Sequence, residues 1–199
     1  MFDAEFERLV IPYAPSIDSG RRINLPKEKI DRVRQLATEI ANAKVNEAHH
    51  RIDGGNEFKR QFTGLLGEAS LEEFLGIDIV DYSVGDSSNY DIADLSRSGL
   101  DIGVKTVEDW KFPIVHKNPI RPELICIKRD NNEVLFFGYA SVDTLRKYQT
   151  DEFILDRRLR QRGTKASFYG FSELIPINSF EELQSVYNRE MYETYNKTV

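Results

Sequence analysis

Residues 90 to 107 (YDIADLSRSGLDIGVKTV) contain charged side chains that two strands would bring together. Side chains alternate along a strand, so Asp101, Gly103 and Lys105 are expected on one face. If 90–95 and 100–107 form a hairpin around SRSG, Asp91 falls opposite Lys105. A carboxylate and an ammonium would then share one patch. The plain alternative is an exposed cross-strand ion pair worth about 0.5 kcal/mol.

A third charged residue, Glu68, lies in the helical segment GLLGEASLEEFLG. It borders the apolar stripe that should pack on the sheet, and Gly64, one turn earlier, would leave room for a ligand. Carboxylates bind Mg²⁺, and a neighbouring lysine can orient or deprotonate a water molecule. The order helix Glu, strand Asp and strand Lys therefore predicts a metal-and-water site.

This order resembles the PD-(D/E)xK nuclease superfamily, over about residues 57 to 107. The resemblance implies an α/β, restriction-endonuclease-like fold, a central mixed β-sheet flanked by α-helices. It also implies hydrolysis of DNA phosphodiester bonds with Mg²⁺, or Mn²⁺ in its place, in a restriction, repair or phage setting. In that resemblance Glu68 is the helix acid, Asp91 the strand acid and Lys105 the lysine. The Val104 carbonyl is a further metal ligand, and a homodimer is compatible with such a protein.

The departure from that pattern is Gly103, which stands where the family has an acid two residues before the lysine. Asp101 could take over the acidic role, although about 6 to 7 Å of strand separates the two positions. Alternatively, the protein is a disabled nuclease that binds nucleic acid or a protein partner. A third explanation is an inactivating substitution. Glycine within a strand also marks a bulge or a close backbone approach.

A basic cluster follows in the second half of the chain. It comprises Arg157, Arg158, Arg160, Arg162 and Lys165. Such a cluster could follow a phosphate backbone, and a solvated charge run is the alternative. The net charge of -6 argues against a chain that coats nucleic acid, but it is compatible with a local basic groove.

Histidines 49, 50 and 116 lack metal-ligand spacing, and Cys126, in LICIK, is expected to be a buried hydrophobe.

The elements that must position these residues follow from periodicity. Helices are predicted from Pro26 to about 49, from 57 to 75, over 141–149, and from Ser179 to about 192, with a Ser179–Glu182 capping box. Strands are predicted over 77–84, 90–95, 100–107 and on both sides of DNN at 130–132, with a late strand near KASF. Residues 1–25 are expected to be an extension and 26–199 a single nuclease-like domain.

The 199 residues contain no apolar run of membrane-spanning length, and the N-terminus lacks a signal-peptide pattern. We therefore expect a cytoplasmic protein with no membrane partner. A structural or assembly role for the terminal segments is a third hypothesis beside the enzyme and the disabled nuclease.

Overall fold

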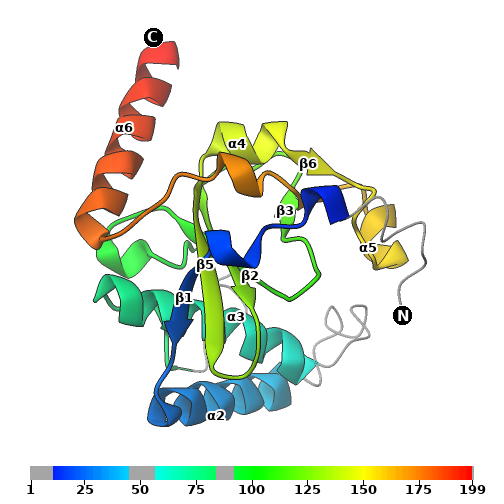
Figure 1. The fold of residues 1–199 in the computed structure, drawn as a ribbon, viewed down its shortest axis with the longest axis vertical. Helices are drawn as coiled ribbons and strands as arrows, with labels where there is room; N and C mark the ends of the chain where they lie inside the picture. Colours follow the sequence, from blue (N-terminus) through cyan, green and yellow to red (C-terminus); the bar gives the residue numbers. More distant parts are fainter. Residues whose placement is uncertain (1–10, 45–56, 84–91, 199) are drawn as a thin grey trace.

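The computed structural model describes residues 11–44, 57–83 and 92–198 (Figure 1). Two short 3-10 helices, Ile11–Tyr13 and Ile17–Ser19, precede strand β1 (Arg21–Asn24). Strand β1 pairs with β5 in antiparallel register, with Ile23 opposite Val134. The predicted extension thus contributes a strand to the main sheet.

Two long helices form layers on one side of this sheet. Helix α2 (Lys27–Lys44) begins after Pro26, and α3 (Glu57–Leu75) has the predicted bounds. Gly76 follows α3 with φ of 67°, a left-handed conformation that suits glycine at a helix end. Helix α3 packs against the sheet and α2 packs against α3 (Figure 1).

The main sheet has the order β1-β5-β4-β2. Strands β4 (Glu123–Lys128) and β5 (Glu133–Ala140) form the predicted hairpin around DNN. Strand β2 (Gly103–Glu108) runs parallel to β4, so the sheet is mixed. A central mixed sheet flanked by helices is therefore confirmed.

The predicted hairpin between 90–95 and 100–107 is wrong for the residues that the structure describes. Residues 92–95 form a turn that continues into a 3-10 helix, Ser96–Ser98, and β2 takes β4 as its neighbour. Pairing with β4 is favourable because β4 is almost wholly apolar and buried.

The strand predicted over 77–84 is also wrong over 77–83. There the backbone N–H groups of Ile79 and Val80 donate to the Glu72 carboxylate at 3.2 and 3.1 Å instead of to a strand.

A second, smaller sheet has the order β3-β7-β6, formed by Ile114–His116, Lys165–Phe168 and Gln149–Thr150. Two short helices, α4 (Val142–Lys147) and α5 (Arg157–Gln161), and a 3-10 turn, Phe171–Glu173, complete this region.

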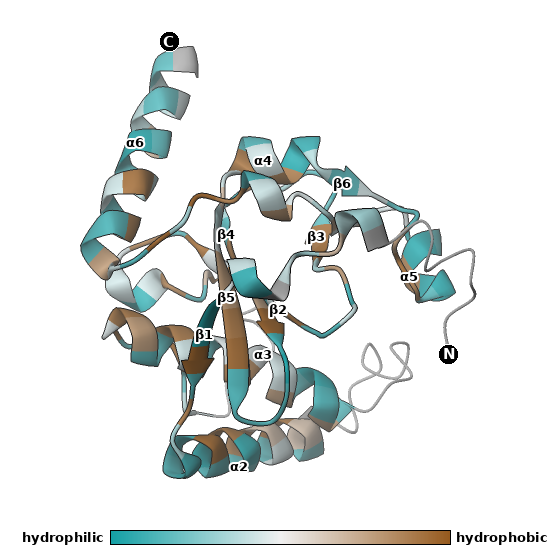
Figure 2. Ribbon diagram, viewed as in Figure 1, coloured by the Kyte–Doolittle hydropathy of each residue, from teal (hydrophilic) through white to brown (hydrophobic). Residues whose placement is uncertain are grey.

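Alternate residues of β4 and β5 contribute to two hydrophobic cores, and Figure 2 shows much of β5 as hydrophobic. Leu124 and Cys126 face α3, whereas Ile125 and Ile127 face the second sheet. Glu123 is two residues before Ile125 on β4, so its side chain lies on the same face and points toward the second sheet. Gly103 pairs with Glu123 and lies beside it on that face.

Helix α6 (Phe180–Thr198) extends away from the body at its C-terminal end (Figure 1). Half of its predicted capping box is present, because the Glu182 N–H donates to Ser179 Oγ at 3.2 Å. The Glu182 carboxylate accepts the N–H of Asn178 at 2.7 Å. In the described segments, no helix combines the length and the apolar character needed to cross a membrane.

Candidate active site

The predicted lysine, Lys105, lines a pocket of about 270 Å³ between the edge of β2 and the second sheet. Its polar lining includes Asp94, Lys105, His116, Asn118, Arg121 and Glu123. These residues come from the turn before β2, from β2, β3 and β4, and from the loop between β3 and β4. The pocket therefore joins residues that are far apart in sequence.

Glu123, the first residue of β4, lies beside Gly103 in the parallel ladder. A Cβ atom at position 103 would collide with Glu123 Oε2 and would lie 2.8 Å from Cδ. The Glu123 carboxylate thus occupies the space that a side chain at 103 would need. Its Oε1 lies 3.3 Å from Lys105 Nζ. A carboxylate from β4 thus lies beside Lys105, at a position where β2 has glycine.

The second oxygen of the same carboxylate, Glu123 Oε2, is buried and has no hydrogen-bond partner in the part of the chain that the structure describes. Burial raises the pKa of Glu123, and the Asp94 carboxylate adds to the rise while Lys105 opposes it. A buried carboxylate oxygen without a partner is costly, so this atom is well suited to bind a cation.

Asp94 contributes the second carboxylate. Its Oδ2 accepts the Val104 N–H at 2.5 Å, which fixes the turn before β2 to the strand. Burial raises the pKa of Asp94 although Lys105 and the hydrogen bond oppose the rise. The Val104 carbonyl, a predicted metal ligand, lies 3.5 Å from Lys105 Nζ.

Glu68 on α3 is a third carboxylate within electrostatic range of Asp94 and Lys105, although it is not part of the pocket lining. Burial and the nearby Asp94 carboxylate raise its pKa to about 8, with Lys105 acting in the opposite direction. The neighbouring Gly67 allows α3 to approach β2, because a Cβ there would lie 2.7 Å from the Cβ of Thr106. Gly64, which was expected to leave room for a ligand, has no atom within 4 Å of such a Cβ. Gly67 is thus the glycine that positions Glu68.

The second sheet adds two basic residues near the same site. His116 and Lys165 are direct cross-strand partners, and Lys165 Nζ is in hydrogen-bond contact with His116 Nε2. Burial lowers the pKa of Lys165, and the positive charges of Lys105 and Arg162 lower it further. Lys165 therefore lies within electrostatic range of Lys105.

The rest of the basic cluster lies on and around α5. Arg160 donates to the carbonyl oxygens of Glu152 and Ile154 at 3.0 and 2.7 Å, which ties it to its own loop. Arg158 is 3.7 Å from Asp156, the N-cap of α5. Arg157 is the first residue of that helix, and Arg162 follows it. Lys165 contacts His116, which lines the pocket, but neither Lys165 nor these arginines belong to the lining themselves.

Two predicted acids have different outcomes. Asp91 lies outside the described residues. Asp101 has a 60% exposed side chain and pairs with Arg121 at 3.3 Å, and it is not part of the pocket lining.

Two acids that sequence reasoning missed, Asp94 and Glu123, stand in the pocket instead. Asp94 is three residues after Asp91 in the same short segment. Glu123 carried a signal in the sequence, since it is the single acid at the start of the apolar strand ELICIK.

The donor types around the pocket bear on whether it can hold a divalent cation. Among the described residues, no group of three or more His, Cys, Asp or Glu side chains is arranged to hold a metal ion as the side chains now stand. The chemistry of the set still fits Mg²⁺ or Mn²⁺, because all the acids are oxygen donors with raised pKa and one oxygen has no partner. A cation would lower the mutual repulsion of these carboxylates.

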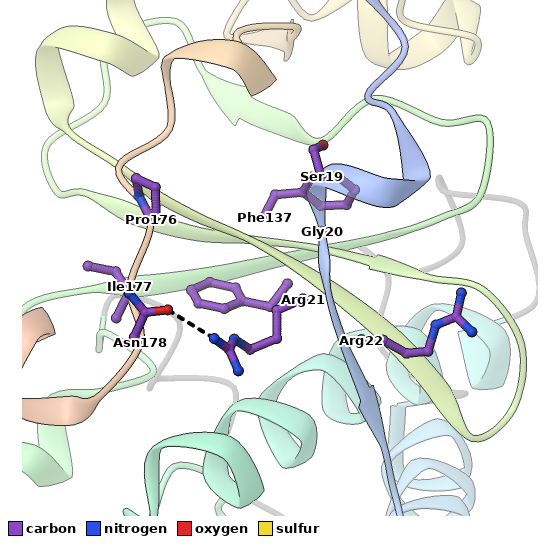
Figure 3. A pocket seen from close by; sticks show the side chains of 9 residues that line it. Ser19, Gly20, Arg21, Arg22, Phe137, Pro176, Ile177 and Asn178 are labelled. Carbon is purple, nitrogen blue, oxygen red and sulfur yellow. Dashed lines mark hydrogen bonds between the residues drawn. The ribbon is translucent and has the colours of Figure 1, made fainter.

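A larger pocket of about 490 Å³ lies beside β1, and its polar groups are already engaged (Figure 3). Arg21 donates to Asn178 Oδ1 at 2.9 Å, and its guanidinium lies 4.8 Å from the centre of the Phe74 ring. Arg22 pairs with Glu133 at 3.5 Å. This pocket has no carboxylate in its lining, so it offers no comparable chemistry.

Cys126 is fully buried, and burial raises the pKa of its thiol, which makes it a poor nucleophile.

Comparisons with protein-family models, with curated proteins and with solved structures found no match to this chain.

Proposed function

We propose that this protein is a metal-dependent DNA endonuclease with a restriction-endonuclease-like fold. The observation that carries the proposal is the pairing of Gly103 with Glu123. An acid two residues before the lysine is absent from β2, and a buried carboxylate from β4 fills that position 3.3 Å from Lys105. The acid and the lysine thus lie together although they belong to different strands.

The proposed roles follow from the donor types. Glu68, Asp94 and Glu123 would hold Mg²⁺ or Mn²⁺, and the Val104 carbonyl remains a candidate for a further ligand. When bound, the ion would lower the pKa of a water molecule and offset negative charge on the phosphate.

Lys105 would orient the attacking water and donate to a phosphate oxygen that gains charge during hydrolysis. His116, in the pocket lining, and its neighbour Lys165 would bind phosphate oxygens of the DNA strand that is cut. Lysine suits this role because its ammonium is a compact charge with three donors.

The disabled-nuclease alternative was motivated by the missing acid at position 103. Glu123 accounts for the missing acid, because it provides a carboxylate beside Lys105 and a side chain at 103 would collide with it. We therefore place catalysis ahead of binding alone. The alternative predicts DNA binding with no effect of Mg²⁺ or Mn²⁺.

Cleavage of supercoiled plasmid and single-stranded DNA with Mg²⁺ or Mn²⁺ tests the proposal. The informative variants are Lys105→Met and Glu123→Gln, which keep side-chain volume and remove charge. Lys147→Met, at an exposed position of α4, is the matched control. We expect cleavage by the wild type and by the control, and a loss of about 100-fold or more in the two site variants. Wild-type inertness with both metals, or a Glu123→Gln variant as active as the wild type, would refute the proposal.

A further inference from the structure

Two isoleucines stand at the mouth of the candidate active site. Ile120 is 81% exposed and Ile92 is 58% exposed, and both line the pocket that contains Lys105. Single exposed hydrophobic residues are ordinary on protein surfaces. Two of them on the rim of one charged pocket form a local apolar edge next to the proposed chemistry.

The loop that carries Ile120 is held firmly in place. Its backbone begins with the Lys117 N–H, which donates to the Thr164 carbonyl at 3.0 Å. It ends with the Pro122 carbonyl, which accepts the Gly103 N–H at 3.0 Å. Between these points, the side chain of Arg146 donates to the Pro119 carbonyl at 3.4 Å. Ile120 is therefore presented on an anchored loop with a proline on each side of the Ile-Arg pair.

The chemistry of the pocket suggests what such an edge would contact. Its lining combines Lys105, Arg121 and the carboxylates of Asp94 and Glu123 with two exposed isoleucines. A DNA strand that places a phosphate inside brings the adjacent base to the rim. In a stacked duplex the flat faces of that base are covered by its neighbours. An aliphatic side chain can contact such a face only when the base is unstacked.

We propose that Ile120, with Ile92 in the same pocket lining, is a wedge that contacts an unstacked base next to the scissile phosphate. The substrate class is thus DNA with a locally unpaired base, such as a mismatch, bulge or fork. This inference rests on the proposed nuclease function and narrows its substrate. The wedge lowers the cost of unstacking, so its removal matters most where the DNA is fully paired.

The test compares Ile120→Ala with Tyr192→Ala, a control at a 69% exposed position on α6. Cleavage is measured on a matched duplex and on the same duplex with one mismatch, and the cut position is mapped. We expect the wild type and the control to prefer the mismatched DNA. Ile120→Ala should cut the matched duplex about 10-fold more slowly and the mismatched duplex within about 2-fold of wild type, because unstacking costs a few kcal/mol.

A binding measurement separates the wedge from the chemistry. The duplex carries 2-aminopurine beside the mapped position, or at the mismatch if no cut occurs, and Ca²⁺ replaces Mg²⁺. Wild-type protein should increase the fluorescence of 2-aminopurine, and Ile120→Ala should not.

Equal increases by the wild type and Ile120→Ala, with equal cleavage of both duplexes, would overturn the wedge and leave the nuclease proposal standing. An increase specific to wild type without any cleavage would support the wedge and overturn the nuclease proposal. Absence of both cleavage and DNA binding would overturn both.

Discussion

Replacing Glu68 by glutamine should stabilise the metal-free protein at alkaline pH. Burial and the Asp94 carboxylate raise the pKa of Glu68 from 4.5 to about 8, so the folded protein holds this proton more tightly than the unfolded chain. Between these two values the unfolded state binds fewer protons, and the free energy of unfolding falls as the pH rises. Glutamine is neutral throughout and removes this decline. The difference between variant and wild type should be small below pH 4.5 and largest above pH 8.

The size of the effect follows from the same values. A rise from 4.5 to about 8 corresponds to about 5 kcal/mol, at about 1.4 kcal/mol for each tenfold change in proton affinity. Part of this is shared with Asp94, which ionises more easily when Glu68 is neutral. We therefore expect Glu68→Gln to gain about 1 to 3 kcal/mol at about pH 9. For a chain of this length that is a rise in Tm of roughly 3 to 10 °C.

The assay is urea or thermal unfolding with a chelator at about pH 5 and about pH 9, followed by the same series with Mg²⁺ or Mn²⁺. Metal at about 100 times its Kd should add about 2.7 kcal/mol to the wild type and much less to Glu68→Gln. Glu73→Gln, one turn further along α3 and half exposed, is the control and should change stability by about 0.5 kcal/mol or less at either pH. The reasoning is refuted if Glu68→Gln is no more stable at the higher pH, or if metal stabilises both proteins equally.

Three further predictions concern the elements around the site. Gly67→Ala should destabilise the protein by about 1 to 3 kcal/mol in urea unfolding, because its methyl group would press against β2, whereas Gly64→Ala, with open space, should gain up to about 1 kcal/mol. Equal effects of these two substitutions would contradict the close approach of α3 to β2. Gly103→Glu alone should reduce DNA cleavage, because the new side chain would displace the Glu123 carboxylate. Adding Glu123→Ala to Gly103→Glu should restore at least part of the cleavage. If the double variant is as inactive as Glu123→Ala alone, an acid at 103 cannot replace the acid at 123. Lys165→Met should raise KM for DNA about 10-fold with a smaller change in kcat and should reduce the salt dependence of binding, because it removes a phosphate contact. A selective loss of kcat would instead give Lys165 a direct part in the chemistry.

The helices and the 123–140 hairpin were predictable because their signals are local. Helix α3 has an apolar stripe between Glu57 and Leu75 and a glycine directly after it, and the DNN turn joins two strongly apolar strands. The neighbour of β2 was not predictable in the same way. A parallel pair joins residues about 20 positions apart through an intervening loop, and nothing within 90–107 specifies β4 as the partner.

The site followed the same division. Lys105 and Glu68 could be proposed from local pattern, because Lys105 is a charge within an apolar run and Glu68 borders an apolar stripe. Glu123 required the register of β2 against β4, which is a tertiary property. Asp94 required the turn that replaces the expected strand, since that turn lets its carboxylate reach the Val104 N–H.

The shared space of Gly103 and Glu123 also restricts how such a site can change over evolutionary time. In the proposed site an acid on either strand would serve, but both can be present only if the Glu123 carboxylate moves aside. A lineage that moved the acid from one strand to the other would pass through a protein with no acid beside Lys105, or through one in which side chains at 103 and 123 compete for the same space. A second change elsewhere would have to support that intermediate. Searches that look for the acid and the lysine on one strand would miss every descendant of such a move, although the chemistry of the pocket would be the same.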